Sequence, residues 1–452
     1  MNEAAMVRSD LPVIIVGAGL AGSLLALFLA RRGYKVEVFE RRPDMRVTEI
    51  PAGRSINLAL STRGLTALAA VGLDEAIASL AIPMEGRMVH GLDGGLSFQP
   101  YGKPGQAILS ISRQAINEIL MDVSEHERNT RFHFNHKCVD VDLDGAAVVV
   151  RDMATDETRT VQGQVVIGAD GAFSKVRRRM QRVGGFNYEQ DFLPHSYKEL
   201  TIPPNHRGEF ALPPGALHIW ARRDFMLIAL PNLDRSFTCT LFMSNEGAIS
   251  FEQLQSPYDV RRFFQNWFPD TLGLMPTLEE DFFDNPTGKL VTIRCQPYHH
   301  GDTTCLVGDA AHAVVPFFGQ GMNASFEDCR VFAELVDIFG GDWAKVLPAF
   351  STVRKPNADA LAQLSLHNYI EMRSDVVDPL YKARKKMDLF LYEHLPDELY
   401  MPLYDMVTFS NIPYAQSIAR AERQDRALKI GAVTALALAG AGAAYWVNKR
   451  RQ

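Results

Sequence analysis

Three glycines near the N-terminus have the spacing of a phosphate-binding turn. Gly17, Gly19 and Gly22 form the segment GAGLAG between two apolar runs. In a β-α-β unit the first glycine makes the tight turn, the second lets the backbone approach a pyrophosphate, and the third lets the helix pack on the strand. Glu40 follows the next predicted strand, where a carboxylate can accept hydrogen bonds from ribose hydroxyls. The pattern predicts a dinucleotide-binding site but does not by itself separate FAD from NAD.

Two later segments favour FAD. The segment GADGAFSKVR places Asp170 at the end of a predicted strand and Arg177 on the helix that follows. The segment CLVGDAAHAVVPFFGQGMNASFED places Asp309 at the end of another strand, and a long helix then opens with Gly321, Met322 and Asn323. Asp309 can accept hydrogen bonds from ribityl hydroxyls. The helix N-terminus can direct backbone N–H groups at the electron-rich edge of a flavin, where reduction adds negative charge.

Hydrophobic periodicity predicts the elements that position these residues. A strand over 12–16, a helix over 20–32 and a strand over 35–39 form an opening β-α-β unit. Strands over 132–142 and 146–150 are predicted to form a hairpin. The glycine turn therefore lies between a buried strand and a helix, which is the context that a dinucleotide site requires.

The fold class predicted from this order is α/β. An FAD-binding Rossmann-like domain carries an inserted antiparallel β-sheet substrate domain and is followed by a C-terminal helical region. The FAD-binding domain is expected in two parts, 1–193 and 297–340, around a β-rich substrate domain over 194–296. Further strands of the substrate domain are expected from 80–110, and helices over 341–428 are expected to complete the substrate pocket.

The composition excludes other classes of partner. A formal net charge of -6 leaves no basic field that would gather nucleic acid. The five cysteines are widely spread and have no metal-ligand spacing, so no metal is expected, and they are typical of reduced thiols in a cytosolic environment. His299 and His300 lack a suitably spaced carboxylate or cysteine and are expected to form a surface turn.

Two apolar runs lie near the chain ends. The first, over 11–30, contains the three glycines and is followed by arginines, so neither a signal peptide nor a membrane span is expected there. The second, over 430–447, has basic residues on both sides and interfacial aromatics near its end. Residues 429–452 are therefore predicted to anchor the chain to the cytoplasmic face of a membrane, the alternative being a terminal helix packed on the protein body.

The three motifs resemble those of the single-component FAD-dependent aromatic hydroxylases. Within them the chain is most similar to the kynurenine 3-monooxygenase family, in the segments GRSINLALSTRG, LPHSYKELTIPP, LHIWAR, MLIALPN, SFTCTLFM, VPFFGQGMNASFEDC, NYIEMR and PLYDMVTFS. The similarity extends over about 12–426. It implies hydroxylation of L-kynurenine to 3-hydroxykynurenine by O2, with FAD as cofactor and NADPH as cosubstrate, through a flavin C4a-hydroperoxide. No side chain needs to act as a nucleophile, because the flavin carries the chemistry.

The resemblance also implies a substrate site. Arg87 and Tyr101 match the pair that binds the substrate carboxylate, and arginine can grip a carboxylate through two parallel N–H bonds. Asn368 and Tyr404 match its polar partners. The remaining substrate-side residues are Glu371 and Met372, which share a helix face with Asn368, and Pro316, Phe317 and Gln320, which are expected beside the flavin. Arg41 and Arg113 join the glycines and acids named above as expected cofactor-binding residues.

Alternatives remain open at this stage. The chain has one complete GxGxxG, so NADPH is expected to lack a Rossmann domain of its own and to dock near Arg177 or in a neighbouring groove. A related flavin monooxygenase for another aromatic substrate or a lipophilic quinone precursor is one rival, although a neutral lipid would leave the charge of Arg87 unpaired. A flavin-binding membrane protein that senses redox state without turnover is the other.

Overall fold

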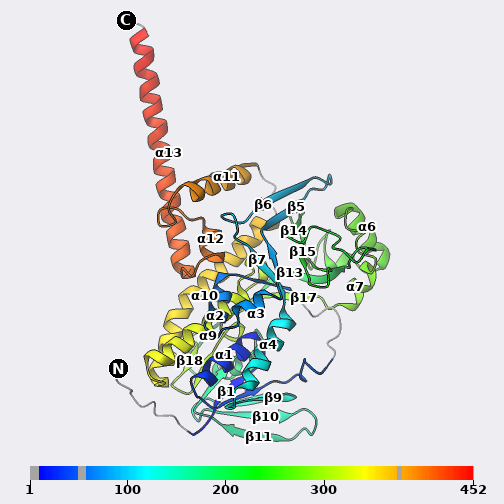
Figure 1. Cartoon of the computed structure of the whole chain (residues 1–452), viewed down its shortest axis with the longest axis vertical. Coiled ribbons are helices and arrows are strands. Elements are labelled where there is room, and N and C mark those ends of the chain that lie inside the picture. The colour runs from blue at the N-terminus through cyan, green and yellow to red at the C-terminus, as the bar shows by residue number, and fades with distance from the viewer. Residues whose placement is uncertain (1–9, 49–56, 374–378, 451–452) are drawn as a thin grey trace.

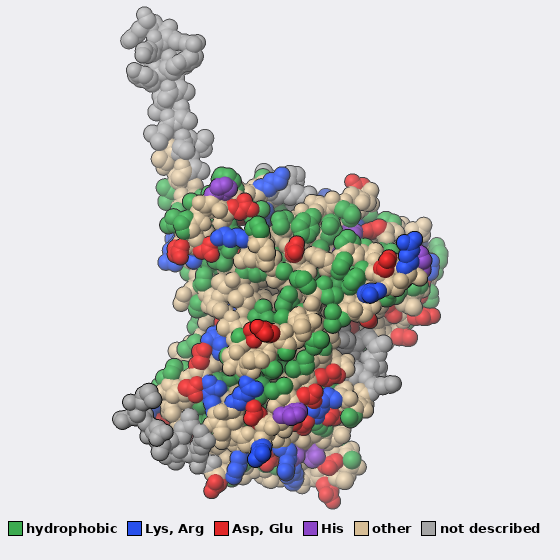
Figure 2. Space-filling model, viewed as in Figure 1, with side chains coloured by type: hydrophobic (Ala, Val, Ile, Leu, Met, Phe, Trp, Pro, Cys, Tyr) green, Lys and Arg blue, Asp and Glu red, His purple; other side chains and the backbone are tan. Residues whose placement is uncertain are grey.

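The computed structural model describes residues 10–48, 57–373 and 379–450, and in the last helix it describes side chains as far as residue 431 and that of Thr434. In Figure 1 a parallel sheet forms the lower lobe and an antiparallel sheet forms the upper lobe, with the C-terminal helices beside both. Charged side chains gather at the lower end of the molecule, whereas hydrophobic side chains cover much of the middle of the face in Figure 2. This arrangement is the α/β flavoprotein architecture predicted from the sequence.

The lower lobe is built on a sheet with the order β18-β19-β12-β1-β2-β8. Its strands are β1 (Val13–Val16), β2 (Val36–Phe39), β8 (Thr130–His133), β12 (Val165–Gly168), β18 (His299–His300) and β19 (Thr304–Leu306). All pairs are parallel except β18 with β19. Every residue of β1 is buried, as expected for a strand of a parallel sheet that is covered on both faces.

Helices cover this sheet and form the main hydrophobic core with it. They are α1 (Leu20–Arg31), α2 (Thr62–Ala69), α3 (Asp74–Ala78), α4 (Arg113–His126), α5 (Lys175–Met180), α8 (Asp309–His312) and α9 (Gly321–Ile338). The side chain of Ser112 caps α4 by accepting the N–H of Ala115 at 3.4 Å. Helix α1 packs on both α4 and α9, which places the two predicted flavin-binding helix N-termini on one side of the lobe.

The upper lobe is a sheet with the order β17-β13-β16-β15-β14-β5-β6. Its strands are β5 (Gly86–His90), β6 (Leu96–Pro100), β13 (Asn187–Ile202), β14 (Ala216–Ala221), β15 (Met226–Pro231), β16 (Phe237–Ser244) and β17 (Gly288–Gln296). The turn η1 (Phe251–Gln253) and helices α6 (Pro257–Trp267) and α7 (Leu278–Asp284) form a second core against it. Strand β5 comes from the segment before the insertion and pairs parallel with β14.

Two three-stranded sheets complete the described strands. One has the order β3-β7-β4 and lies between the lobes, with β3 (Asn57–Leu60), β4 (Ile82–Met84) and β7 (Ile108–Ser112). The other has the order β11-β10-β9, with β9 (His136–Asp142), β10 (Ala147–Asp152) and β11 (Thr158–Gln162). In Figure 1 the second sheet lies at the lower end of the molecule.

Three local predictions were wrong. The strand predicted over 132–142 is broken at Asn135, which has a positive φ of 57°, so β8 joins the parallel sheet while β9 joins another. His299 and His300 form the short strand β18 rather than a turn, because they pair with β19 at the sheet edge. The β-rich segment expected from about 194 has its first strand, β13, beginning at Asn187.

The C-terminal helices lie beside both lobes. They are α10 (Trp343–Arg373), α11 (Pro379–His394), α12 (Leu403–Thr408) and α13 (Tyr414–Arg450), and α13 projects away from the body in Figure 1. The predicted membrane anchor over 429–452 falls mostly on residues whose side chains lie outside the described part of the chain. Among the residues that the structure does describe, no helix combines the length and apolar character needed to cross a membrane.

Candidate functional site

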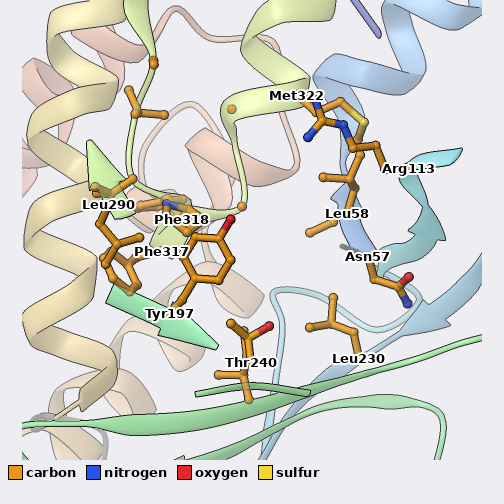
Figure 3. A pocket seen from close by; sticks show the side chains of 18 of the residues that line it. Asn57, Leu58, Arg113, Tyr197, Leu230, Thr240, Leu290, Phe317, Phe318 and Met322 are labelled. Carbon is orange, nitrogen blue, oxygen red and sulfur yellow. The ribbon is translucent and has the colours of Figure 1, made fainter. Parts of the chain in front are cut away.

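A cavity of about 550 Å³ lies where the two lobes and the C-terminal helices meet. Figure 3 shows Leu230 and Thr240 rising into it from the upper sheet, with Phe317 and Leu290 on one side and Met322 with Arg113 on another. Several predicted site residues line this one cavity: Gly19, Arg87, Tyr101, Arg113, Asp309, Pro316, Phe317, Gly321, Met322, Met372 and Tyr404. The cavity therefore joins residues predicted to bind a cofactor to residues predicted to bind a substrate.

The glycine turn forms one end of the cavity. Gly17 has a φ of 105°, and a Cβ there would lie 2.6 Å from the carbonyl oxygen of Ala169. A Cβ on Gly22 would lie 1.9 Å from the carbonyl oxygen of Gly17, so these two positions permit close packing rather than line the cavity. Gly19, in contrast, has open space around it and precedes α1, which leaves the helix N-terminus accessible to an anion.

The side chain of Glu40 holds the glycine turn in place through hydrogen bonds. One of its carboxylate oxygens accepts a hydrogen bond from the backbone N–H of Ala18 at 3.0 Å. The other accepts two hydrogen bonds from Arg42, one from its backbone N–H and one from its Nε, each at 2.9 Å. Burial acts to raise the pKa of Glu40, but the contacts of Arg42 outweigh it, so the pKa is lowered and the group is ionised. Arg41 is exposed and does not line the cavity.

The GADG loop is held by its own side chains. The carboxylate of Asp170 accepts the N–H of Lys175 at 2.6 Å, while burial raises its pKa. Arg177 is buried, and its guanidinium donates to the carbonyl oxygens of Ala310 at 2.7 Å and Ala172 at 2.5 Å. This arginine therefore ties the GADG loop to helix α8, and its guanidinium is directed at these two segments rather than at solvent.

The N-terminus of α9 is the second helix end at the cavity. Gly321 and Met322 line it, and within the described residues no side chain caps this helix. Asn323 accepts the N–H of Ser61 at 2.9 Å and donates to the carbonyl oxygens of Ala59 and Gly319 at 2.8 and 2.9 Å. Asn323 thus positions the turn before α9 rather than facing the cavity.

Arg87 forms the other end of the cavity, on β5. It is buried, and its guanidinium carbon lies 4.7 Å from the ring centroid of Tyr404 and 5.6 Å from that of Tyr101. In the described part of the chain its Nε and the hydroxyl of Tyr101 lack hydrogen-bond partners. Burial opposes the charge of Arg87, but the surrounding tyrosines and Glu371 raise its pKa above the usual value. A buried cation with unused donors is suited to binding an anion.

Glu371 balances part of this charge. Its carboxylate lies 3.6 Å from Nη1 of Arg87 and 3.7 Å from Nζ of Lys385, and it accepts a hydrogen bond from the hydroxyl of Tyr381. Burial acts to raise the pKa of Glu371, but Lys385 and Arg87 lower it overall. Its separation from Arg87 is that of an ion pair without a direct hydrogen bond, which leaves the arginine donors available.

Aromatic rings and amides frame the middle of the cavity. Tyr404 stacks on Tyr101 with ring centroids 5.5 Å apart and on Phe318 with centroids 5.3 Å apart. Asn368 is buried and donates to the carbonyl oxygen of Phe317 at 2.6 Å. Gln320 is also buried, and its amide oxygen accepts from the hydroxyl of Tyr414 at 3.1 Å. Asn368 and Gln320 do not line the cavity but hold the loop that does.

Sequence reasoning missed much of the apolar lining. The upper sheet contributes part of it through Leu217, Met226, Ile228, Leu230, Phe242, Leu290 and Val291, together with Tyr197, Thr238 and Thr240. A signal existed, because Met226, Ile228 and Leu230 alternate along β15 as residues on one face of a strand must. Tyr381 and Lys385, which contact Glu371, carried no signal, because their position depends on how α11 folds back onto α10.

The cavity fits an FAD molecule. Two helix N-termini open onto it, at Gly19 and Gly321, which suits a pyrophosphate at one and a flavin edge at the other. The glycine packing at Gly22 is what brings α1 close enough to β1 for such a site. Asp309 and Arg113, both exposed side chains at the cavity, are placed to bind ribityl or phosphate groups.

Comparison with known proteins gives concordant matches. A family model described as an FAD binding domain matches residues 10–365. Relatives named kynurenine 3-monooxygenase include those of Myxococcus xanthus, at 48% identity over 92% of this chain and 88% of the relative, and Flavobacterium johnsoniae, at 46% over 92% and 93%. The relative from Sus scrofa is 45% identical over 92% of this chain and 88% of its own length.

Solved structures share the fold at much lower identity. The 2-methyl-3-hydroxypyridine-5-carboxylic acid oxygenase has a TM-score of 0.67 at 18% identity, over 82% of this chain and 95% of that one. PqsL, a probable FAD-dependent monooxygenase from Pseudomonas aeruginosa, has a TM-score of 0.64 at 20% identity, over 84% of this chain and 99% of that one. These likenesses support the two-lobed flavoprotein fold.

Proposed function

Because the chain belongs to the kynurenine 3-monooxygenase family of FAD-binding enzymes, we propose that it hydroxylates L-kynurenine to 3-hydroxykynurenine with O2 and NADPH. The observation that carries the substrate assignment is Arg87, a buried cation with an unpaired Nε that faces the same cavity as the predicted flavin site. L-Kynurenine brings an α-carboxylate of the opposite charge on an aromatic body of matching apolar character.

The headgroup is proposed to bind at the Arg87 end. The guanidinium and the hydroxyl of Tyr101 donate to the α-carboxylate, which satisfies two buried polar groups that otherwise lack partners in the described structure. Glu371 stays ionised beside them and prevents two uncompensated positive charges from meeting when the ammonium group of the substrate enters. The ring then lies along the apolar wall formed by Leu217, Met226 and Phe242.

FAD, when bound and reduced, supplies the electrons that split O2 so that one oxygen atom enters the aromatic ring. The chain's own residues orient the substrate and exclude water. Phe317 and Pro316 close the cavity between the predicted flavin site and the substrate end, and Asn368 fixes that turn through the carbonyl oxygen of Phe317. Water exclusion matters because it favours transfer of oxygen to the ring over loss of peroxide.

NADPH is proposed as the reductant. The buried guanidinium of Arg177 donates to the carbonyl groups of Ala310 and Ala172, so we propose that NADPH meets a neighbouring surface rather than this side chain. An Arg177→Lys variant should therefore lose bound FAD through loosened loops before it shows any specific loss of NADPH affinity.

Turnover of the purified protein tests the proposed function. With FAD and NADPH, oxygen uptake and NADPH oxidation should accelerate on addition of L-kynurenine, and mass spectrometry should show a product heavier by one oxygen atom. Hydrogen peroxide without hydroxylated product would contradict the assigned substrate. Turnover of a neutral lipophilic phenol in preference to L-kynurenine would support the related quinone-precursor hydroxylase instead.

A further inference from the structure

One face of strand β13 leads from the cavity to the surface of the molecule. Side chains alternate along a strand, so Tyr197, Glu199 and Thr201 share this face, while Leu200 on the other face belongs to the core under α6 and α7. Tyr197 lines the cavity and Thr201 is exposed, whereas Glu199 between them is only 6% exposed. Glu199 pairs across the sheet with Thr240 of β16, which also lines the cavity. Glu199 therefore lies behind the cavity wall, between the cavity and the surface.

The carboxyl group of Glu199 is buried without a partner in the described part of the chain. It makes no hydrogen bond or ion pair there, although the backbone carbonyl oxygen of Glu199 accepts from the side chain of Asn285 at 3.0 Å. Burial alone raises the pKa of Glu199 to about 7. A buried carboxyl group without a partner costs stability, so packing does not account for it. A group that is partly protonated near neutral pH is suited to passing protons.

The charged groups around Glu199 are engaged elsewhere. Strand β13 packs on β16, β17 and α7. On the opposite face of β13, Lys198 donates to a backbone carbonyl oxygen at 2.6 Å. From α7, Asp281 accepts the backbone N–H of Thr201 at 3.0 Å, and from β17, Lys289 lines the cavity. On β16 the residue opposite Glu199 is an uncharged threonine.

Tyr197 connects this carboxyl group with the cavity. Its ring reaches into the cavity in Figure 3 and packs against Gly288, where a Cβ would lie 2.6 Å from the hydroxyl oxygen. Burial raises the pKa of Tyr197, Glu199 raises it further, and Arg113 acts to lower it. The hydroxyl group is therefore within electrostatic reach of Glu199 on one side and of Arg113, at the predicted cofactor site, on the other. Residues two apart on a strand are separated by about 7 Å, a span that one water between the two side chains can bridge.

We propose that Glu199 supplies protons to the cavity through the hydroxyl group of Tyr197. The reaction needs such a supply, because L-kynurenine, O2, NADPH and one proton give 3-hydroxykynurenine, NADP+ and water. NADPH provides the two electrons, and the oxygen atom that does not enter the ring leaves as water. Tyr197 passes a proton to that oxygen atom and takes one from Glu199, which regains its proton from solvent beside the exposed Thr201. This inference rests on the proposed function.

Infrared titration of the holoenzyme tests the carboxyl group first. The wild type should contain a protonated carboxyl group that titrates at about pH 7, and Glu199→Gln should lack it. Burial also raises the pKa of Asp405 to about 7, so Asp405→Asn should remove a different band and keep that of Glu199. The control Glu189→Gln, an exposed position on the same strand, should keep both bands. Identical titrations of the wild type and Glu199→Gln would overturn the proposal.

Single-turnover kinetics test the transfer, with reduced holoenzyme and L-kynurenine mixed with O2. Glu199→Gln should slow hydroxylation by about 100-fold. Its Kd for L-kynurenine should stay within about twofold of the wild type, with the FAD content unchanged. The wild-type rate should fall as the pH rises through about 7, because the carboxyl group loses its proton, and Glu199→Gln should lack this fall. Glu199→Asp, which keeps an acid at this position, should recover part of the rate, and Glu189→Gln should match the wild type.

The route through Tyr197 is tested by combining variants. Tyr197→Phe should slow hydroxylation about as much as Glu199→Gln while it keeps the infrared band of Glu199. The double variant should be no slower than either single variant, because both changes interrupt one route. Losses that multiply in the double variant, or a Glu199→Gln variant with the wild-type rate at every pH, would overturn the proposal. Failure of the wild type to hydroxylate L-kynurenine would instead count against the proposed function, and the infrared titration would still decide whether Glu199 carries the proton.

Discussion

Two buried arginine clusters in this molecule differ in how fully they are paired. The first, which we term the α9 network, consists of Arg63, His312, Glu327, Asp328 and Arg354. Arg354 donates to Asp328 at 2.6 Å and to Glu327 at 2.7 Å, and Arg63 donates to Glu327 at 2.9 Å. His312 lies 2.5 Å from Asp328, which also accepts the N–H of Gly308. Every carboxylate of the network therefore meets cations or donors at hydrogen-bond distance.

The second cluster surrounds Arg87 and is incomplete. Arg87 is 6% exposed and Arg354 is 3% exposed, so burial does not distinguish them. The nearest carboxylate to Arg87 that the structure describes is 3.6 Å away, and its Nε has no partner within the described residues. Leaving a buried donor unpaired costs about 1–3 kcal/mol. A buried charge whose hydrogen bonds are all made within the protein holds elements together. A buried charge with unpaired donors beside a cavity indicates a site for a ligand.

The largest expected change in stability comes from breaking the α9 network. Arg354→Met removes the cation between Glu327 and Asp328 and leaves two buried carboxylates short of partners, which should lower the free energy of unfolding by about 3–5 kcal/mol. Arg261→Met breaks a surface pair with Glu279 and should cost less than about 1 kcal/mol. Chemical denaturation of the holoenzymes measures both. Similar losses for the two variants would show that the network does not hold the fold.

Arg87→Met should leave stability almost unchanged but should weaken binding of L-kynurenine. Its stability should stay within about 1 kcal/mol of the wild type, because no partner is left fully unpaired when Lys385 remains beside Glu371. The Kd for L-kynurenine should rise by about 100-fold, with FAD still bound. Arg87→Lys should recover only part of this affinity, since lysine keeps the charge but not the planar fork. Fluorescence titration of the bound flavin reports the affinities. Loss of FAD in Arg87→Met would show that the residue supports the cofactor site instead.

The smallest expected effect concerns Asp405, a buried acid next to Tyr404. Oδ1 of Asp405 has no partner in the described part of the chain, and burial raises the pKa of Asp405 to about 7. The folded protein thus binds this proton more tightly than the unfolded chain, and stability is lost as the pH rises from the unfolded pKa of about 4 through 7. Asp405→Asn stays neutral, so its Tm should exceed that of the wild type by more at about pH 8 than at about pH 5. An equal difference at both pH values would argue against a protonated Asp405.

Local sequence patterns pointed to some of the residues that line the cavity, and family resemblance pointed to others. The glycine turn and the strand-end acids are local patterns, so Gly19 and Asp309 could be placed from short segments. The α9 network could not, because Arg63 and Glu327 meet only after α2 packs on α9. The break at Asn135 was missed because an alternating pattern does not reveal a left-handed residue that sends one run into two sheets. Arg87 and Tyr101 were found through family resemblance, since nothing local distinguishes them from ordinary strand and turn residues.

A binding cycle with and without the substrate carboxylate tests the role of Arg87 most directly. Kd values are measured for L-kynurenine and for its decarboxylated amine, with the wild-type holoenzyme and with Arg87→Met. The wild type should prefer L-kynurenine by about 100-fold, and the variant should bind the two ligands within a few-fold of each other. A preference for L-kynurenine that survives undiminished in Arg87→Met would contradict the account, because the carboxylate would then be bound elsewhere.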